Sequence, residues 1–337
     1  MENDIEQEAF AAEATKVSES FASLFDSKDF DWLVANKPHF AHYTSIHALE
    51  KILESGEIWF SNPLFMNDYE EMRVGIKLAR QIFLNSEEVM NACTTPERHQ
   101  YCKKLFTDYY NDFDLNHAFN VYVFCLSQID FKDTDGKLSM WRSYGSNGDG
   151  AAIVFNSAFI NQTGGAYFII AKVAYESPEK RIEILQQKLR EWCAILKQLD
   201  LSDAQLITAT YIFFQWCLVF ALTTKHHGFI EESEWRIIYL PMIDSMKEQE
   251  KNFGYAIGVN GVEPKLKVPV RPYKDPKATW TFESIIDRII LGPSFSTLLA
   301  KKSVERMLNN LRPTLADKVV ASTIPLRPQS RWFQSEL

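Results

Sequence analysis

The sequence predicts an α+β fold in which helices are inserted between the short strands of one mixed central sheet. Runs of β-branched and aromatic residues, such as residues 120–127 (NVYVFCLS), are typical of strands. Apolar stripes at helical spacing, such as the one within residues 179–197, are typical of helices, and the two kinds of segment are interspersed along the chain. With 46% hydrophobic and 24% charged residues among 337, the chain has the composition of a globular protein and not of a disordered one.

The N-terminal segment is strongly acidic. Residues 1–31 contain nine acidic and two basic residues, which gives this segment a net charge of −7. Phe21, Leu24 and Phe25 form a small apolar face, so residues 1–36 are expected to be an acidic amphipathic helical segment. A single α+β domain is expected to follow over residues 37–330.

The first half of that domain is expected to open with a strand at residues 40–43. Thr44 or Ser45 can cap a helix that Gly56 is placed to end. A second short strand is predicted at 58–61, and Asn67–Asp68 are expected to open the next helix, most simply as its cap. A further helix is predicted at residues 96–111, and a strand buried on both faces at 120–127.

The second half of the domain alternates between short strands and longer helices. Residues 138–144 are expected to form a short helix and residues 145–150 a glycine-rich turn. Strands are predicted at 151–155, 167–175, 235–240 and 319–326, with a β-rich region at 252–291. Helices are predicted at 179–197 and 297–311.

One helix is apolar enough to raise the question of a membrane. Residues 206–222 (LITATYIFFQWCLVFAL) are uncharged over 17 positions, which is the lower limit of a spanning length. The segment contains Thr208, Thr210 and Gln215 and is the single such stretch in the chain. We therefore expect a long apolar helix at 203–224 that is buried in the domain and is not inserted in a membrane.

Cysteine content and charge distribution indicate a compartment and a kind of partner. The chain has five cysteines, no CxxC pair and no basic-then-apolar leader at its start, so we expect a cytoplasmic protein without disulfides. Residues 265–337 contain thirteen basic and six acidic residues, a net charge of +7. This basic region either contacts a phosphate-bearing partner or is an ordinary solvated surface.

Three groups of motifs occur in a characteristic order. The first group is His42-Tyr43-Thr44-Ser45, Ile58-Trp59-Phe60-Ser61 and Asn67-Asp68-x-x-Glu71. The second group is Phe124-Cys125-Leu126-Ser127, Met140-Trp141-x-x-Tyr144-Gly145 and Gly150-x-x-Ile153-x-Phe155. The third group is Lys225, Glu232-x-Glu234-Trp235-Arg236-Ile237, Leu291-Gly292-Pro293 and Ser322-x-Ile324-Pro325-Leu326. In this order and spacing, over residues 38–327, the chain resembles the bacterial domain of unknown function 2971. That resemblance supplies no chemistry.

The order of the motifs also resembles that of ADP-ribosyltransferase-like folds. In those enzymes a first-strand His or Arg anchors a nicotinamide dinucleotide, a middle-strand Ser or a helix Tyr supports it, and a late Glu orients the nicotinamide ribose. The resemblance implies that NAD is the substrate and that ADP-ribose passes to a protein or nucleic-acid acceptor. A toxin or an anti-phage effector would be the biological setting.

Glu234 and Glu232 are the candidate catalytic residues. Cleavage of the bond between nicotinamide and ribose develops positive charge on the ribose, and a preorganised carboxylate stabilises that charge. If both glutamates lie on one strand, they face the same side and can reach one cleft with His42 and Ser127. The alternative is that both acids pair with Lys225 or Arg236 at a sheet edge.

The remaining site residues are candidates for binding the dinucleotide. His42 can hydrogen-bond a ribose hydroxyl, Tyr43 and Tyr144 can stack on nicotinamide, and Ser127 can support the ligand. Each has an equally simple structural role in the core or in a turn, and Trp141 and Trp235 are expected to be packing residues. The set of cofactor-binding candidates is His42, Tyr43, Thr44, Ser127, Tyr144, Arg142 and Arg236. Of these, Arg142 and Arg236 can clamp a pyrophosphate or pair with acids.

Two other classes of function remain open. A non-enzymatic binding or regulatory module would keep the same fold without turnover. A metal-dependent nuclease would have to be built from Asp68, Glu71, Glu232 and Glu234. The sequence has no GxGxxG motif after a strand, no P-loop, no HExxH motif and no GxSxG elbow, and we expect no metal site.

Overall fold

The computed structural model describes residues 13–25, 28–66, 69–157, 167–258, 261–270 and 281–326. The chain divides into two compact units, each assembled from three separated segments. The first unit takes residues up to 28, 63–121 and 174–227, and the second takes 29–62, 122–173 and 228 onwards. Residues 37–330, expected as one domain, therefore contribute to both units.

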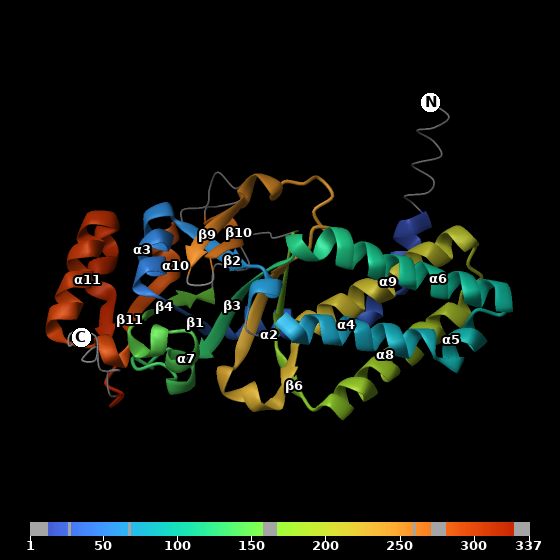
Figure 1. Ribbon diagram of the computed structural model, residues 1–337, viewed down its shortest axis with the longest axis horizontal. Coiled ribbons are helices and arrows are strands. Elements are labelled where there is room, and N and C mark those ends of the chain that lie inside the picture. The colour runs from blue at the N-terminus through green and yellow to red at the C-terminus, as the bar shows by residue number, and fades with distance from the viewer. Residues whose placement is uncertain are drawn as a thin grey trace, which may run out of the picture. The chain divides into compact units, whose positions relative to one another are not determined.

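The second unit contains a mixed sheet of ten strands (Figure 1). The main path runs in the order β12-β11-β4-β1-β3-β2-β10-β9, and β8 pairs with both β3 and β5. The strands are β1 (His39–Thr44), β2 (Glu57–Ser61), β3 (Tyr122–Ile129), β4 (Ala151–Asn156), β5 (Phe168–Lys172), β8 (Glu234–Tyr239), β9 (Phe253–Gly258), β10 (Gly261–Pro269), β11 (Ile286–Leu291) and β12 (Val319–Ala321). The pairing of β11 with β12 is parallel and the other pairings are antiparallel, which confirms the mixed sheet.

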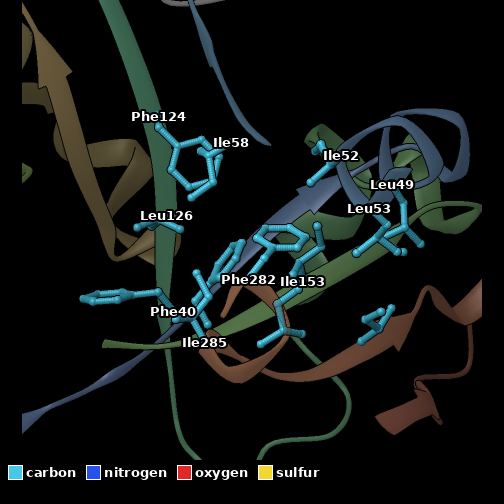
Figure 2. Packing of buried hydrophobic residues seen from close by; sticks show 14 of the residues in the cluster. Phe40, Leu49, Ile52, Leu53, Ile58, Phe124, Leu126, Ile153, Phe282 and Ile285 are labelled. Carbon is cyan, nitrogen blue, oxygen red and sulfur yellow. The ribbon is translucent and has the colours of Figure 1, made fainter. Parts of the chain in front are cut away.

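Helices cover the middle of this sheet on both faces. On one face α3 (Ile46–Ser55), α10 (Phe282–Ile285) and α11 (Leu298–Leu311) join the larger apolar core, and Figure 1 shows these helices near β4 and β11. Figure 2 shows Phe40, Ile153, Phe282 and Ile285 converging in that core. On the other face α7 (Leu138–Ser143) packs Met140 and Trp141 in a smaller core.

The two cores follow from strand alternation. Side chains of successive strand residues point to opposite faces, so an uninterrupted apolar run supplies both. In β4, Ile153 and Phe155 join the larger core, whereas Ala152 and Val154 join the smaller one. The sequence prediction that the run at 120–127 is buried on both faces is confirmed, because Val123 and Ser127 on one face of β3 and Phe124 and Leu126 on the other are buried.

The ends of α3 are as the sequence predicts. The Ser45 side chain accepts a hydrogen bond from the Ala48 amide at the first turn, and Gly56 ends the helix in the left-handed conformation with φ of 69°. These two local signals fix the helix between β1 and β2, which brings Ile52 and Leu53 onto the core.

Gly150 and Gly292 allow the backbone to approach closely at one end of the sheet. A Cβ atom on Gly150 would overlap the carbonyl oxygen of Thr44, and one on Gly292 would overlap the carbonyl oxygen of Gly148. The amide of Gly292 in turn donates a 2.9 Å hydrogen bond to the carbonyl of Gly150. No larger residue fits at Gly150 or Gly292 without moving backbone.

The first unit is mainly helical, with a two-stranded parallel ribbon beside the helices. Its helices are α4 (Tyr69–Leu84), α5 (Glu87–Ala92), α6 (Pro96–Asp112), α8 (Pro178–Gln198) and α9 (Asp203–Leu222), and its strands are β6 (Ala174–Glu176) and β7 (Thr224–His226). Aromatic rings fill the space between these helices. Phe83 stacks on Phe106 with ring centroids 4.3 Å apart, and Phe213 lies 5.5 Å from Trp192. Such ring pairs add about 0.5–1.5 kcal/mol each to the burial of their area.

Among the described residues, α9 is long and apolar enough to cross a membrane by length and composition. It packs against α4, α6 and α8, and none of residues 205–222 is exposed. Trp192 donates a 2.9 Å hydrogen bond to the Ala209 carbonyl, and Tyr109 donates one of 3.1 Å to the Ile207 carbonyl. This packing is that of a core helix, as the sequence predicts, and the expectation that α9 does not enter a membrane stays a prediction.

Several element boundaries differ from the sequence prediction. The N-terminal segment is not one helix, because residues 13–20 and α2 (Lys28–Asn36) are separated by a 3₁₀ turn at Ala22–Leu24, and residues 1–12 lie outside the described residues. The strand predicted at 167–175 is two strands, β5 and β6, which pair in different sheets. The last strand ends at Ala321 and not at 326. The short helix α5 was not predicted.

Candidate functional site

Three neighbouring strands carry His42, Ser127 and Glu234, and the last two lie in one row. Ala41 on β1 pairs with Ser127 on β3, and Ser127 pairs with Glu234 on β8. Directly paired residues point to the same face of a sheet, so Ser127 and Glu234 share the face that carries Ala41. The prediction that His42, Ser127 and Glu234 come from three separate strands is confirmed.

His42 does not share that face. It follows Ala41 in β1, so alternation turns its side chain away from Ser127 and Glu234. Its ring lies against Phe124, a member of the larger core, with centroids 4.4 Å apart. The expectation that all three side chains line one cleft is therefore wrong, because one position along a strand reverses the face.

The His42 imidazole takes the place of a strand-pairing hydrogen bond. The register of β1 with β3 ends at Ala41, and one residue later His42 Nδ1 lies 3.0 Å from the carbonyl oxygen of Cys125. A carbonyl can only accept, so Nδ1 carries the proton. Burial, assisted by the positive charge of Lys265, lowers the pKa of His42 to about 4 although the Cys125 carbonyl opposes the shift. The ring is neutral at pH 7, and its Nε2 has a lone pair.

Glu234 and Arg236 form a buried ion pair. Arg236 Nε lies 2.8 Å from Glu234 Oε1, and Arg236 Nη2 lies 3.2 Å from Glu234 Oε2. Both residues are buried, with 4% and 6% of their surface exposed. The two hydrogen bonds fix the plane of the carboxylate. Of the alternatives open for Arg236, the structure has the pairing with an acid.

Glu232 lies before β8 and not on it. It ends a 3₁₀ segment, His227–Glu232, and the next residue, Ser233, has a left-handed backbone with φ of 45°. The argument that Glu232 and Glu234 face the same side as strand neighbours is therefore wrong. A left-handed non-glycine residue of this kind costs about 1–3 kcal/mol and persists only where its surroundings hold it.

Three side chains hold Glu232 in place. Ser127 Oγ donates to the Glu232 carbonyl at 2.6 Å, and Lys137 Nζ donates to the same carbonyl at 3.3 Å. Tyr144 donates its hydroxyl to Glu232 Oε1 at 3.1 Å. Ser127 and Tyr144 are thus brought to Glu232, and Lys137 joins them without having been predicted. Burial lowers the pKa of Lys137, while Asp133 and Glu232 oppose that shift.

Tyr43 is a packing residue. Its ring meets Trp141 edge-on at 4.8 Å, and its hydroxyl accepts a 2.8 Å hydrogen bond from the Lys137 amide. Burial raises its pKa to about 12. Gly136 lies so close to this pair that a Cβ atom there would be 2.8 Å from the Tyr43 hydroxyl. The core role of Trp141 is confirmed.

The other predicted residues are dispersed. Thr44 ends β1 opposite Ala151, next to the close backbone contacts of Gly150 and Gly292, which we call the glycine junction. Arg142 is exposed on α7. Trp235 is buried between Trp32 and Phe40, as expected of a packing residue.

The nuclease alternative is not tested by the structure. Where side chains are described, no group of three or more His, Cys, Asp or Glu is arranged to hold a metal ion. Asn67 and Asp68 lie outside the described residues, as does the side chain of Glu71. Two of the four acids in that hypothesis therefore cannot be placed.

These features define a mixed α+β protein with a buried ionic site on its central sheet. Residues 140–237 match the model of the family described as protein of unknown function, DUF2971, so this part of the chain is similar to that family. The matched range contains Tyr144, Glu232, Glu234 and Arg236. No curated protein and no solved structure matches the chain.

Proposed function

We propose that the chain is an ADP-ribosyltransferase-like enzyme that cleaves NAD between nicotinamide and ribose and transfers ADP-ribose to a macromolecular acceptor. The observation that carries the proposal is the row across β1, β3 and β8, where Ser127 lies directly opposite Glu234 and beside the strand of His42. The motif order implies a first-strand His, a middle-strand Ser and a late Glu. These three residues can serve one ligand only if their strands are neighbours in the sheet, as β1, β3 and β8 are.

Glu234 is the proposed electrostatic group. The departure of nicotinamide leaves positive charge on the ribose. A carboxylate that is held in place, in surroundings of low dielectric constant, stabilises this charge more than a mobile, solvated one does. Arg236 supplies the fixation through two hydrogen bonds. Glu232, fixed by Tyr144, is the proposed acid for activating the acceptor.

The basic region has a binding role in this proposal. His42 donates Nδ1–H to the Cys125 carbonyl and faces away from Glu234, so it is not assigned a contact with the ribose. Lys302 and Arg306 are exposed on α11 and suit an acceptor that carries phosphate, such as a nucleic acid, although a protein acceptor fits the same chemistry of transfer. All five cysteines are free thiols, in keeping with a cytoplasmic toxin or anti-phage effector.

A second candidate is a nucleotide-binding module without turnover. It is favoured by the engagement of both Glu234 oxygens by Arg236, since a carboxylate so paired presents less net charge to a ligand. Under this alternative NAD binds and no nicotinamide is released.

Nicotinamide release from NAD, followed with and without protein and nucleic-acid acceptors, tests the proposal. Glu234→Gln should lower the rate by about 10²–10³ because the amide keeps the shape and loses the charge. Glu54→Gln, an exposed change on α3, is the control and should not alter the rate. Melting curves must show that both variants are folded.

A second variant protects the test against misfolding. Glu232→Gln keeps an acceptor for the Tyr144 hydroxyl, so it should fold normally and lose transfer more than nicotinamide release. Equal rates in the wild type and both site variants would refute the roles of these glutamates. NAD binding by calorimetry without any release would favour the binding module.

A further inference from the structure

β9 is the last strand at one end of the ten-stranded sheet. In the described part of the chain it pairs with β10 alone, in an antiparallel register that runs from Phe253 opposite Leu266 to Gly258 opposite Gly261. The outer edge of β9 therefore has no strand beside it among the described residues.

One hydrogen bond assigns the direction of the backbone groups of β10. The Val270 amide donates to the Gly56 carbonyl at 3.1 Å, which continues the register of β10 with β2. Backbone groups of successive strand residues point to opposite edges. Residues of β10 at even-numbered positions therefore face β2, and those at odd-numbered positions, such as Glu263 and Lys265, face β9.

The same alternation assigns the backbone groups of β9. Gly254 and Ala256 are the partners of Lys265 and Glu263, so they form the hydrogen bonds to β10. Tyr255 and Ile257 consequently direct their N–H and C=O groups to the outer edge. That edge presents two donors and two acceptors at the spacing of a strand ladder.

β9 lacks the features that keep strand edges from associating. Edges in monomeric proteins carry charges or proline, are bulged or very short, or are covered by another element. The sequence of β9, FGYAIG, has no charged residue and no proline, and its register with β10 is continuous. Tyr255 and Ile257 are 61% and 73% exposed. They share one face of the strand, and the other face carries only glycine and alanine.

Two other edges of the same sheet are protected. β12 is only three residues long. On β5, the exposed Lys172 adds a charge, and its amide donates a 3.1 Å hydrogen bond to Asp29 Oδ2, so a side chain occupies that edge. The β9 edge differs from both in being longer, uncharged and apolar.

We propose that the outer edge of β9 binds the same edge of a second copy of this chain, antiparallel about a two-fold axis at Ala256. In this register Tyr255 of each copy lies opposite Ile257 of the other, and the two pairs exchange four backbone hydrogen bonds. Pairs of an aromatic with a β-branched residue stabilise neighbouring strands. The small Ala256 side chains meet at the axis on the other face.

Charge favours a second copy as the occupant. A neutral edge suits a neutral partner strand, and β9 is itself such a strand. On the adjoining strand Lys265 Nζ lies 3.0 Å from Glu263 Oε2, so these two charges offset each other beside the axis. No like charges stand directly opposite each other in the proposed ladder.

Sedimentation velocity of the full chain over a range of concentrations tests the proposal. The wild type should dimerise, and Ile257→Lys should raise the Kd of the dimer by about 10- to 100-fold, because the change occurs twice in a symmetric interface. Val262→Lys is the matched control. Val262 pairs with Ile257, shares its face and is 65% exposed, but it lies on β10, one strand away from the edge. This control should dimerise as the wild type does.

A proline variant tests the backbone contribution separately. Ile257→Pro removes an N–H that points to the outer edge, and proline is accepted on an edge strand in this orientation. The pairing of β9 with β10 should remain, and the dimer should weaken by about 10- to 100-fold through the loss of two hydrogen bonds. Melting curves establish that both Ile257 variants are folded.

A cysteine at the axis tests the register without weakening the edge. In a non-hydrogen-bonded antiparallel pair the Cα atoms are about 4.5 Å apart, which is within the range of a disulfide. Ala256→Cys should therefore give a covalent dimer with diamide, which takes up the two electrons and two protons that the thiols lose. Val262→Cys and the wild type should give none.

Three results would overturn the proposal. The first is a wild type that stays monomeric up to about 1 mM, which would leave this edge to another segment or another protein. The second is equal dimerisation of the wild type and both Ile257 variants. The third is an equal loss in Val262→Lys and Ile257→Lys, which would indicate nonspecific apolar association. None of these measurements uses NAD, so the proposed function is tested separately.

Discussion

The Arg236 guanidinium and the Glu234 carboxylate form a pair of buried opposite charges. Both are almost fully buried, so removal of one leaves the other desolvated and without this bidentate contact. The sequence identifies both residues and leaves two roles open for them. Burial decides between the roles, and it depends on the folded sheet, in which the neighbours of β8 are the sequence-distant strands β3 and β5.

Arg236→Met should destabilise the protein by about 3–5 kcal/mol, because the buried Glu234 carboxylate loses its two hydrogen bonds from the guanidinium. The double variant Glu234→Gln with Arg236→Met should recover a large part of that loss, since both charges of this pair are then removed. Urea unfolding of the two single variants and the double variant measures the coupling. Strictly additive losses would show that the pair contributes nothing as a pair.

Protonation of His42 should make stability depend on pH. Its pKa is about 4 in the folded chain and about 6.5 when unfolded, so the unfolded state binds the proton first as the pH falls. Stability should therefore decrease between about pH 6.5 and pH 4 and level off below. His42→Gln retains a donor for the Cys125 carbonyl and cannot titrate, so it should lose this part of the pH dependence in urea unfolding. An identical pH profile in the variant would contradict the assignment.

At the scale of elements, local signals predict helix ends and fail at strand edges. Ser45 and Gly56 fix α3 through their own backbone neighbours, and the sequence alone predicts both. The face of His42 and the position of Glu232 depend on where β1 leaves β3 and where β8 begins, and these points depend on pairing across more than 80 residues. The left-handed Ser233 has no glycine or asparagine to indicate it.

The glycine junction gives a prediction at this scale. Gly150→Ala should destabilise the protein by about 3 kcal/mol, since the added Cβ meets the Thr44 carbonyl and the strand ends must separate. Gly254→Ala on β9 is the matched control, because its Cβ would lie 3.5 Å from Lys267 in ordinary contact. The control should stay within about 1 kcal/mol of the wild type. Equal melting temperatures for the two variants would show that the junction relaxes freely.

At the scale of the whole molecule, the chain passes repeatedly between its two units. The helical unit draws on residues 63–121 and 174–227, and each segment supplies part of one aromatic core. Phe83 and Phe106 come from the first segment, and Trp192 and Phe213 come from the second. Hydrophobic periodicity predicts these helices one by one. It cannot show that helices separated in sequence by residues 122–173, which belong to the other unit, pack together in one core.

The fragment 63–121 should consequently be unfolded when expressed alone, because α4 and α6 lack the rings that cover theirs. Joining 63–121 to 174–227 through a flexible glycine-serine linker should restore a cooperative transition. Circular dichroism in the far and near ultraviolet, with thermal melting, measures this. Cooperative melting of fragment 63–121 by itself would contradict the prediction.

The pairing of β2 with β10 has a consequence for synthesis on the ribosome. Lys265 is the partner of Ser61, so β2 emerges about 200 residues before the strand that completes its pairing. At about 5–20 residues per second, the backbone edge of β2 waits of order 10–40 s for that partner. An open strand edge is a template for pairing with another chain. Efficient production of this protein should thus depend on the rate of translation between β2 and β10.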